Sequence, residues 1–220
     1  MSILIPVVNS KNLNDFKKKL SQLKNFDGLI QIDLSDGKFT NWKNYTNLSK
    51  IKDLKISLPF EIHFMFEKPE IYIEDLVFLK PKKIILHVEA IKNFNKCYTI
   101  CKKNNIELVL AICPETPVIK LFPYLKYLNT VLMLSVIPGP SGQTMQYYVL
   151  ENISLIKKRN RKIKIEIDGG VNESNLDSVI SFGVDYICMS SAIFGFKKPM
   201  ERIKFLEQEM KNINKTRYIH

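Results

Sequence analysis

The chain has 220 residues, 45% of them hydrophobic and 25% charged, a balance typical of a globular protein with one core. Its 33 lysines and arginines outnumber the 22 aspartates and glutamates, which gives a formal net charge of +11. The lysines are spread along the predicted helices, without a long basic block or interleaved aromatic residues. The charge pattern therefore argues against a nucleic-acid-binding protein, although a positive field could attract an anionic small molecule.

The cysteines and the start of the chain bear on its location. Cys97, Cys101, Cys113 and Cys188 form no C-x-x-C pair and are typical of reduced thiols in a cytoplasmic protein. The first residues lack the basic segment and cleavage site of a signal peptide. No apolar run approaches the roughly 20 residues of a transmembrane helix. We therefore expect a cytoplasmic protein with no membrane partner.

Eight short β-rich runs alternate along the chain with longer, mostly amphipathic stretches. We predict strands at Ile3–Val8, Leu29–Leu34, Phe60–Phe66, Lys83–His87, Glu107–Ile112, Val131–Val136, Lys164–Ile167 and Tyr186–Met189. The predicted helical stretches are Asn14–Lys24, Pro69–Leu79, Lys92–Asn104, Gln143–Arg159 and Asn172–Phe182. This alternation predicts a parallel sheet closed into a (β/α)8 barrel, the TIM barrel, as a single domain over residues 1–220. The lysine- and asparagine-rich tail after Met210 is expected to fray.

Three predicted strands carry polar residues on one face, because side chains alternate along a strand. The apolar faces must meet the helices, so the polar faces point into the barrel, where polar groups are costly unless they are paired or bind a ligand. Glu61, Lys164 and Glu166 lie deeper in their strands, and we expect them to form a buried hydrogen-bonded network. Asp33, His63 and Asp168 lie at strand ends, where barrel enzymes build their active sites, and for these we expect a function.

At these residues the sequence resembles the ribulose-phosphate 3-epimerase family over almost its whole length. Each similar segment falls at a predicted strand end, and together they are far more specific than any one alone. In chain order, the segments that carry the resemblance are Ile5–Ser10, Gln31–Gly37, Glu61–Met65, Leu86–Ala90, Ser135–Gln143, Glu166–Gly170 and Ser191–Phe194.

The resemblance implies an enzyme that inverts C3 of a phosphorylated ketose, D-ribulose 5-phosphate to D-xylulose 5-phosphate, through an enediolate. Inversion needs an acid/base group on each side of the substrate, and the resemblance gives these roles to Asp33 and Asp168. It also implies a divalent metal, with zinc expected first and manganese, iron or cobalt as alternatives. The implied ligands are Asp33, His63, Asp168 and, where the family has a histidine, Gln31. An amide oxygen binds most of these ions more weakly than imidazole, so the ion could be weakly held or absent.

The resemblance also implies a set of residues that contact a sugar phosphate. They are Ser10, Met65, Gly139, Ser141, Gly142, Gly169, Gly170, Ser190 and Ser191. Backbone N–H groups of the glycine-rich loops would hold the phosphate. Ser141 and Ser190 replace family glycines and Ser35 replaces a methionine, which predicts an altered phosphate site and a wetter or wider pocket. Family members are often dimers or hexamers, which implies a homo-oligomer.

Other interpretations stay open. One is 3-epimerisation of a longer substrate, such as allulose 6-phosphate or a heptulose phosphate. Another is a sugar-phosphate-binding protein without catalysis, which the loss of the histidine favours and the retained aspartates oppose. The related barrel decarboxylases and hexulose-phosphate synthases carry Asp-x-Lys-x-x-Asp, but Asp33 is followed by Leu34 and Ser35, so the lysine is missing.

Overall fold

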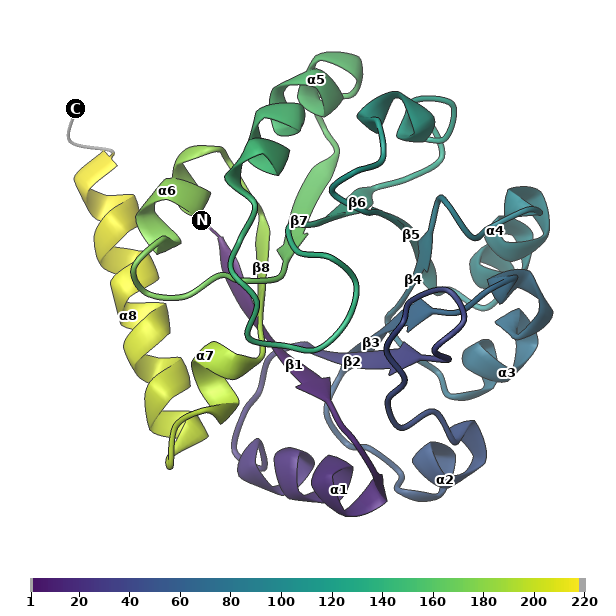
Figure 1. The fold of residues 1–220 in the computed structure, drawn as a ribbon, viewed down its shortest axis with the longest axis horizontal. Helices are drawn as coiled ribbons and strands as arrows, with labels where there is room; N and C mark the ends of the chain where they lie inside the picture. Colours follow the sequence, from purple (N-terminus) through teal and green to yellow (C-terminus); the bar gives the residue numbers. More distant parts are fainter. Residues whose placement is uncertain (1, 218–220) are drawn as a thin grey trace.

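The computed structural model describes residues 2–217, in which eight parallel strands close into a barrel inside a ring of helices (Figure 1). Each strand pairs with the next, and the last pairs with the first. The strands are β1 (Ile3–Asn9), β2 (Ile30–Ser35), β3 (Phe60–Met65), β4 (Lys83–His87), β5 (Glu107–Ile112), β6 (Thr130–Leu134), β7 (Lys164–Asp168) and β8 (Tyr186–Met189). The predicted TIM barrel is confirmed.

Helices and short 3₁₀ turns connect the strands. The helices are α1 (Leu13–Gln22), α2 (Leu48–Asp53), α3 (Ile73–Phe78), α4 (Phe94–Lys103), α5 (Asn152–Arg159), α6 (Leu176–Ser181), α7 (Ser191–Phe194) and α8 (Pro199–Arg217). The 3₁₀ turns are Pro69–Ile71, Val118–Leu121 and Tyr147–Glu151. Asparagine side chains begin three of the helices: Asn12, Asn47 and Asn93 each accept a backbone N–H from the first helical turn.

Two expectations about helices were wrong. The stretch predicted as a helix from Gln143 is irregular until Tyr147, because Gly142 has a positive φ of 94° and the Gln143 amide bonds back to the Ile137 and Pro140 carbonyls. The tail after Met210 does not fray at that point: α8 continues to Arg217. Buried Ile203 and Leu206 anchor this helix, which lies against α6, α7 and β1 (Figure 1).

The main hydrophobic core lies between the strands and the helices. In β2, for example, Ile30, Ile32 and Leu34 are fully buried in it, and the intervening polar residues face the barrel interior. This alternation is why a barrel strand can present Gln31 and Asp33 to its interior without losing its packing.

Near the amino ends of the strands, the barrel interior holds a buried ion triad of Glu61, Lys83 and Glu166. The ammonium of Lys83 lies 2.8 Å from Glu61 Oε2 and 3.1 Å from Glu166 Oε2. Burial, together with the charge of Glu166, raises the pKa of Glu61. The expectation that Lys164 joins this network was wrong. Lys164 is the exposed first residue of β7 and its ammonium donates to the Tyr186 hydroxyl, whereas Lys83 pairs in register with Glu61.

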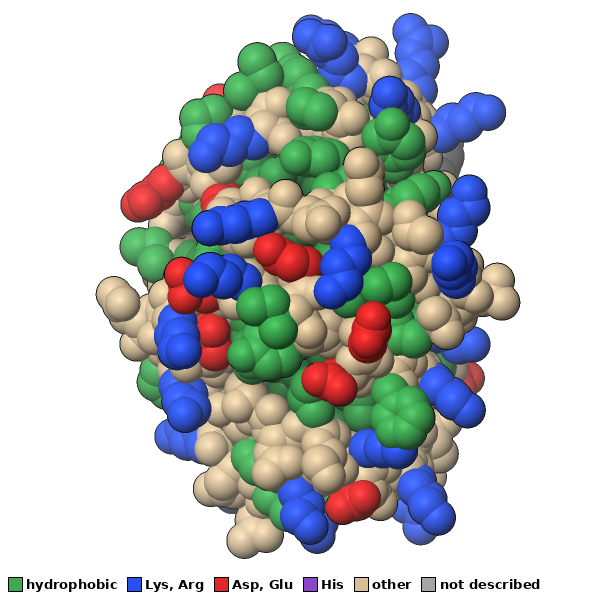
Figure 2. All heavy atoms as spheres, turned by 90° about the vertical axis from the view of Figure 1, so that its right-hand side faces the viewer, with side chains coloured by type: hydrophobic (Ala, Val, Ile, Leu, Met, Phe, Trp, Pro, Cys, Tyr) green, Lys and Arg blue, Asp and Glu red, His purple; other side chains and the backbone are tan. Residues whose placement is uncertain are grey.

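The outer surface is rich in lysine without a continuous basic patch on the face drawn in Figure 2. There, lysine and arginine side chains alternate with acidic and apolar ones. Among residues 2–217, no helix combines the length and apolar character that crossing a membrane requires.

Candidate active site

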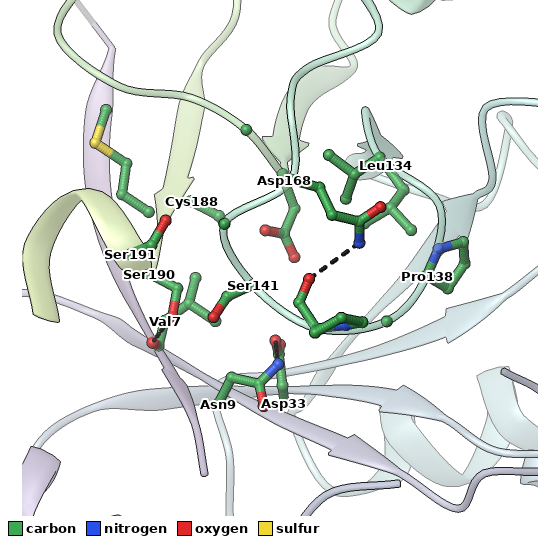
Figure 3. Close-up of a pocket in the computed structure, with 18 of the residues that line it drawn as sticks. Val7, Asn9, Asp33, Leu134, Pro138, Ser141, Asp168, Cys188, Ser190 and Ser191 are labelled. Atoms are coloured by element: carbon green, nitrogen blue, oxygen red, sulfur yellow. Dashed lines mark hydrogen bonds between the residues drawn. The ribbon is translucent and has the colours of Figure 1, made fainter. Parts of the chain in front are cut away.

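A cleft opens at the carboxyl ends of the strands (Figure 3), and the loop that follows β6 contributes to its lining. Asp33 reaches it from β2, His63 from β3 and Asp168 from β7. Asp33 and His63 are direct neighbours in the sheet register, which places their side chains side by side on the inner face. The side chains of Asp33 and Asp168 are 9% and 13% exposed to solvent, so both can contact a small molecule in the cleft.

Four polar side chains converge at the floor of this cleft. His63 Nδ1 lies 3.4 Å from Asp33 Oδ1 and 3.4 Å from Asp168 Oδ2. Gln31 Nε2 donates hydrogen bonds to the same two carboxylate oxygens, each at 2.8 Å. The two nitrogens and two oxygens therefore form a closed ring, which we call the carboxylate ring.

Three of these side chains have the donor atoms of a metal site. The ligand atoms of Asp33, His63 and Asp168 lie within 4.8 Å of one another, a separation that one divalent ion can span. His63 Nδ1 is buried and has no hydrogen-bond partner of normal geometry, so its lone pair could serve as a ligand. These three residues fit a divalent ion.

Gln31 does not fit the expected role of metal ligand in the observed arrangement. It presents its amide nitrogen, which has no lone pair for a metal, to the two carboxylates. Its oxygen Oε1 instead accepts a bond of 3.3 Å from the Cys188 thiol. In this ion-free arrangement the Gln31 oxygen therefore faces away from the ion position, because the two carboxylates select the donor end of the amide.

The charges of the ring shift the pKa values of its members. Burial lowers the pKa of His63, but the neighbouring carboxylates of Asp168 and Asp33 outweigh burial and raise it to about 9. Burial and the charge of Asp33 raise the pKa of Asp168, against the hydrogen bonds from His63 and Gln31. In the absence of an ion, an imidazolium beside two carboxyl groups is the arrangement these shifts favour at neutral pH.

A second chain of side chains supports His63 from behind. His63 Nε2 lies 2.8 Å from His87 Nε2, and His87 Nδ1 lies 3.3 Å from Glu89 Oε2. The backbone N–H of Cys113 donates to Glu89 Oε1 at 2.8 Å. Burial raises the pKa of Glu89, but the hydrogen bond and charge of His87, with the Cys113 N–H, lower it overall to about 2. An anionic Glu89 thus fixes both imidazole rings behind the cleft.

Two asparagines that sequence reasoning missed hold Asp33. Asn9 Nδ2 donates to Asp33 Oδ2 at 3.2 Å, and Asn44 Nδ2 donates to the Asp33 carbonyl at 2.8 Å. The signal for Asn9 was present in the strand alternation, because β1 runs one residue beyond its predicted end and Val7 and Asn9 both line the cleft. By the same alternation Ser10 faces away: it is 1% exposed, its hydroxyl has no partner, and it lies outside the cleft lining. The expected contact of Ser10 with the substrate is therefore not supported.

Ser35 does not widen the pocket. Its hydroxyl lies 2.9 Å from Thr40 Oγ1 and donates to the Trp42 carbonyl at 2.6 Å, and it is not among the cleft residues. The serine thus fastens the loop that follows β2, and the expectation of a wetter cleft at this position was wrong. Met65, by contrast, lines the cleft as expected.

The remaining candidate residues come together at one end of the cleft, from the loops after β6, β7 and β8. All of them line it: Gly139, Ser141, Gly142, Gly169, Gly170, Ser190 and Ser191. At Gly170, φ is 70° and a Cβ would lie 2.4 Å from the Met145 backbone nitrogen, so only glycine lets the two loops approach this closely. The Ser190 hydroxyl donates to the Val7 carbonyl at 3.1 Å (Figure 3).

Solved structures confirm the architecture. The 3-hexulose-6-phosphate synthase from Salmonella typhimurium superimposes with a TM-score of 0.73 at 11% identity, over 97% of this chain and 100% of that chain. N-(5'-phosphoribosyl)anthranilate isomerase from Pyrococcus furiosus gives a TM-score of 0.65 at 17% identity, over 96% of this chain and 100% of that one. At these identities the likeness shows the fold alone.

Sequence comparison identifies the family more specifically than the structural likeness does. The ribulose-phosphate 3-epimerase of Aquifex aeolicus (strain VF5) is 31% identical over 175 residues, 77% of this chain and 78% of the relative. The enzyme of the same name from Buchnera aphidicola subsp. Baizongia pistaciae is 30% identical over 203 residues, 87% of this chain and 88% of the relative. A family model described as the ribulose-phosphate 3 epimerase family matches residues 3–194. The chain is therefore a member of the ribulose-phosphate 3-epimerase family.

Proposed function

We propose that this protein interconverts D-ribulose 5-phosphate and D-xylulose 5-phosphate by inverting C3. The observation that carries the proposal is that Asp33 and Asp168 reach one open cleft from different strands, as Figure 3 shows. The family relatives named above carry the same activity in their names. We also propose a cytoplasmic location and a homo-oligomer, dimer or hexamer, as the family resemblance implies.

The two aspartates would act as the acid/base pair. One carboxylate removes the C3 proton, which is acidic because it lies alpha to the C2 carbonyl, and the other returns a proton to the opposite face. In the ion-free site, the raised pKa of Asp168 suits the group that carries a proton at the start of a turnover. Asn9, which bonds to Asp33 Oδ2, would keep the second carboxylate aimed at the substrate.

The enediolate that forms between the two proton transfers carries negative charge, which the site must stabilise. A bound divalent ion, with zinc first and manganese, iron or cobalt as alternatives, would be held by Asp33, His63 and Asp168 and would supply positive charge there. Met65 and Leu134 line the cleft and would shield the intermediate from water.

The phosphate would lie at the glycine- and serine-rich end of the cleft. Loops after β6, β7 and β8 meet there, and no acidic residue other than Asp168 comes from them to the cleft lining. Backbone N–H groups and serine hydroxyls are suited to a dianion. Ser141 and Ser190 add hydroxyl groups where the family has glycine, so the grip on the sugar phosphate would differ in detail.

Exchange of the C3 hydrogen of ribulose 5-phosphate in heavy water, followed by NMR, tests the proposal. We expect exchange and formation of xylulose 5-phosphate by the unaltered protein, and a loss of roughly 1,000-fold or more in Asp33→Asn and Asp168→Asn. Asp27→Asn, a change at an exposed aspartate, is the matched control.

Three outcomes would contradict the proposal in different ways. Full turnover in either active-site variant would remove the aspartates from the chemistry. Exchange of a six- or seven-carbon ketose phosphate alone would establish a longer substrate, such as allulose 6-phosphate or a heptulose phosphate. Binding of ribulose 5-phosphate by calorimetry, without exchange under any added zinc, manganese, iron or cobalt, would indicate a sugar-phosphate-binding protein.

A further inference from the structure

We propose that Gln31 bridges the two acid/base aspartates when no ion is bound, so that the ion-free enzyme keeps them in position for proton transfer and binds a divalent ion only weakly. The proposal rests on the proposed function of Asp33 and Asp168. It concerns the carboxylate ring defined above, whose members are Gln31, Asp33, His63 and Asp168.

The geometry of the ring is the first argument. Two carboxylates this close repel each other unless something positive or hydrogen-donating lies between them. Gln31 Nε2 has two hydrogens and uses both, one on Asp33 Oδ1 and one on Asp168 Oδ2, at 2.8 Å each. Hydrogen bonds from an amide to an ionised oxygen are among the stronger kinds in proteins. The amide therefore does the bridging that an ion would otherwise do.

The surroundings of Gln31 fix which end of the amide faces the aspartates. The side chain is fully buried, and its oxygen faces the Cys188 thiol at 3.3 Å. The same thiol lies 3.2 Å from Glu166 Oε1, and Glu166 Oε2 bonds to the Lys83 ammonium at 3.1 Å. Among the described residues, Cys188 is the only hydrogen-bond donor to Gln31 Oε1. Cys188 therefore connects the carboxylate ring to the ion triad below it.

Turning the amide over would be unfavourable. It would point Oε1 at two carboxylate oxygens and lose both bonds that Nε2 now donates. An ion that binds between Asp33 and Asp168 must therefore displace the amide hydrogens of Gln31. Such an ion has three good ligands, Asp33, His63 and Asp168, whereas a histidine at position 31 would supply a fourth. Gln31 consequently both stabilises the ion-free ring and weakens the binding of an ion.

The test compares the unaltered protein with Gln31→His after removal of bound metal by a chelator. Zinc affinity is measured by competition with a chelating dye, and cobalt binding by its visible absorption. We expect Gln31→His to bind zinc roughly 100-fold more tightly, because a nitrogen ligand replaces a competing donor. Gln208→His, which adds a histidine at an exposed position of α8, controls for a surface imidazole.

Proton transfer is measured on the same samples as C3 exchange of ribulose 5-phosphate. With chelator present, the unaltered protein should keep its rate within about threefold, whereas Gln31→His should lose at least about tenfold and recover it with zinc. Gln31→Leu removes the bridge without adding a ligand, so its exchange in chelator should fall at least about tenfold with no gain in zinc affinity.

The outcomes separate the failure of this inference from the failure of the proposed function. If the unaltered protein loses exchange in chelator and regains it with zinc, the inference is overturned and the epimerase remains. If Gln31→His binds zinc no more tightly than the unaltered protein, the inference is likewise overturned. If ribulose 5-phosphate never exchanges, with or without zinc, the proposed function fails, and the zinc affinities alone decide whether Gln31 acts as the bridge.

Discussion

The interior of this barrel holds two pairs of carboxyl groups, one above the other, and they differ in access and in partner. At the amino end, Glu61 and Glu166 are fully buried against the ammonium of Lys83. At the carboxyl end, Asp33 and Asp168 meet His63 and an amide and remain open to a cleft. A pair of buried carboxyl groups does not make an active site by itself. The upper pair can exchange protons because its partners leave room for a substrate, whereas a permanent cation neutralises and seals the lower pair.

The largest expected effect that separates the two pairs is on activity. Asp33→Asn should reduce C3 exchange by roughly 1,000-fold or more, as set out above, while Glu61→Gln should leave it within about tenfold. Glu61 is the matched comparison because it occupies the same inner face one strand away. Comparable losses in both variants, with both proteins folded, would erase the distinction between a reactive pair and a structural pair.

The lower pair should dominate stability instead. Lys83→Met leaves two carboxyl groups buried without their cation, and we expect it to lower the free energy of unfolding by about 3–5 kcal/mol, measured in urea. Lys164→Met, which removes an exposed lysine near the same end of the barrel, should change it by less than about 0.5 kcal/mol. An unchanged midpoint for Lys83→Met would show that the triad is not a stabilising network.

The upper pair should give stability a distinct pH dependence in metal-free protein. The folded pKa of His63, about 9, lies above its ordinary value of 6.5, so its protonation stabilises the fold. This contribution is complete below about pH 6.5 and is lost as the pH rises through about 9. The urea midpoint of chelator-treated protein should therefore fall between these pH values. His63→Gln should flatten that slope, and an equal slope in both proteins would contradict the assignment.

Much of this organisation follows from the sequence. Alternation within three strands identified Asp33, His63 and Asp168 at the rim and Glu61 and Glu166 below them. It could not assign the cation of the triad, because a lysine at the start of an apolar strand has the same pattern as one in solvent. It could not give the orientation of the Gln31 amide either, since nitrogen and oxygen exchange places by rotation about one bond.

The smallest effect concerns the support of Asp33, where sequence and structure disagree. Asn9→Ala removes a hydrogen bond to Asp33 Oδ2 and should lower kcat about tenfold, with a smaller change in KM. Ser10 lies outside the cleft, and its buried hydroxyl has no hydrogen-bond partner. Ser10→Ala should therefore leave kcat and KM within about twofold of their values in the unaltered protein. The opposite order of effects would restore Ser10 as a substrate contact and remove Asn9 from the site.

The central claim is that two carboxyl groups that reach the cleft from different strands invert C3 through protons that exchange with water. The most direct measurement is NMR of xylulose 5-phosphate formed from ribulose 5-phosphate by the unaltered protein in heavy water. The proposed mechanism predicts that the xylulose 5-phosphate carries deuterium at C3. A product that keeps the original hydrogen at C3, or ribulose 5-phosphate that binds and is released unchanged, would contradict it.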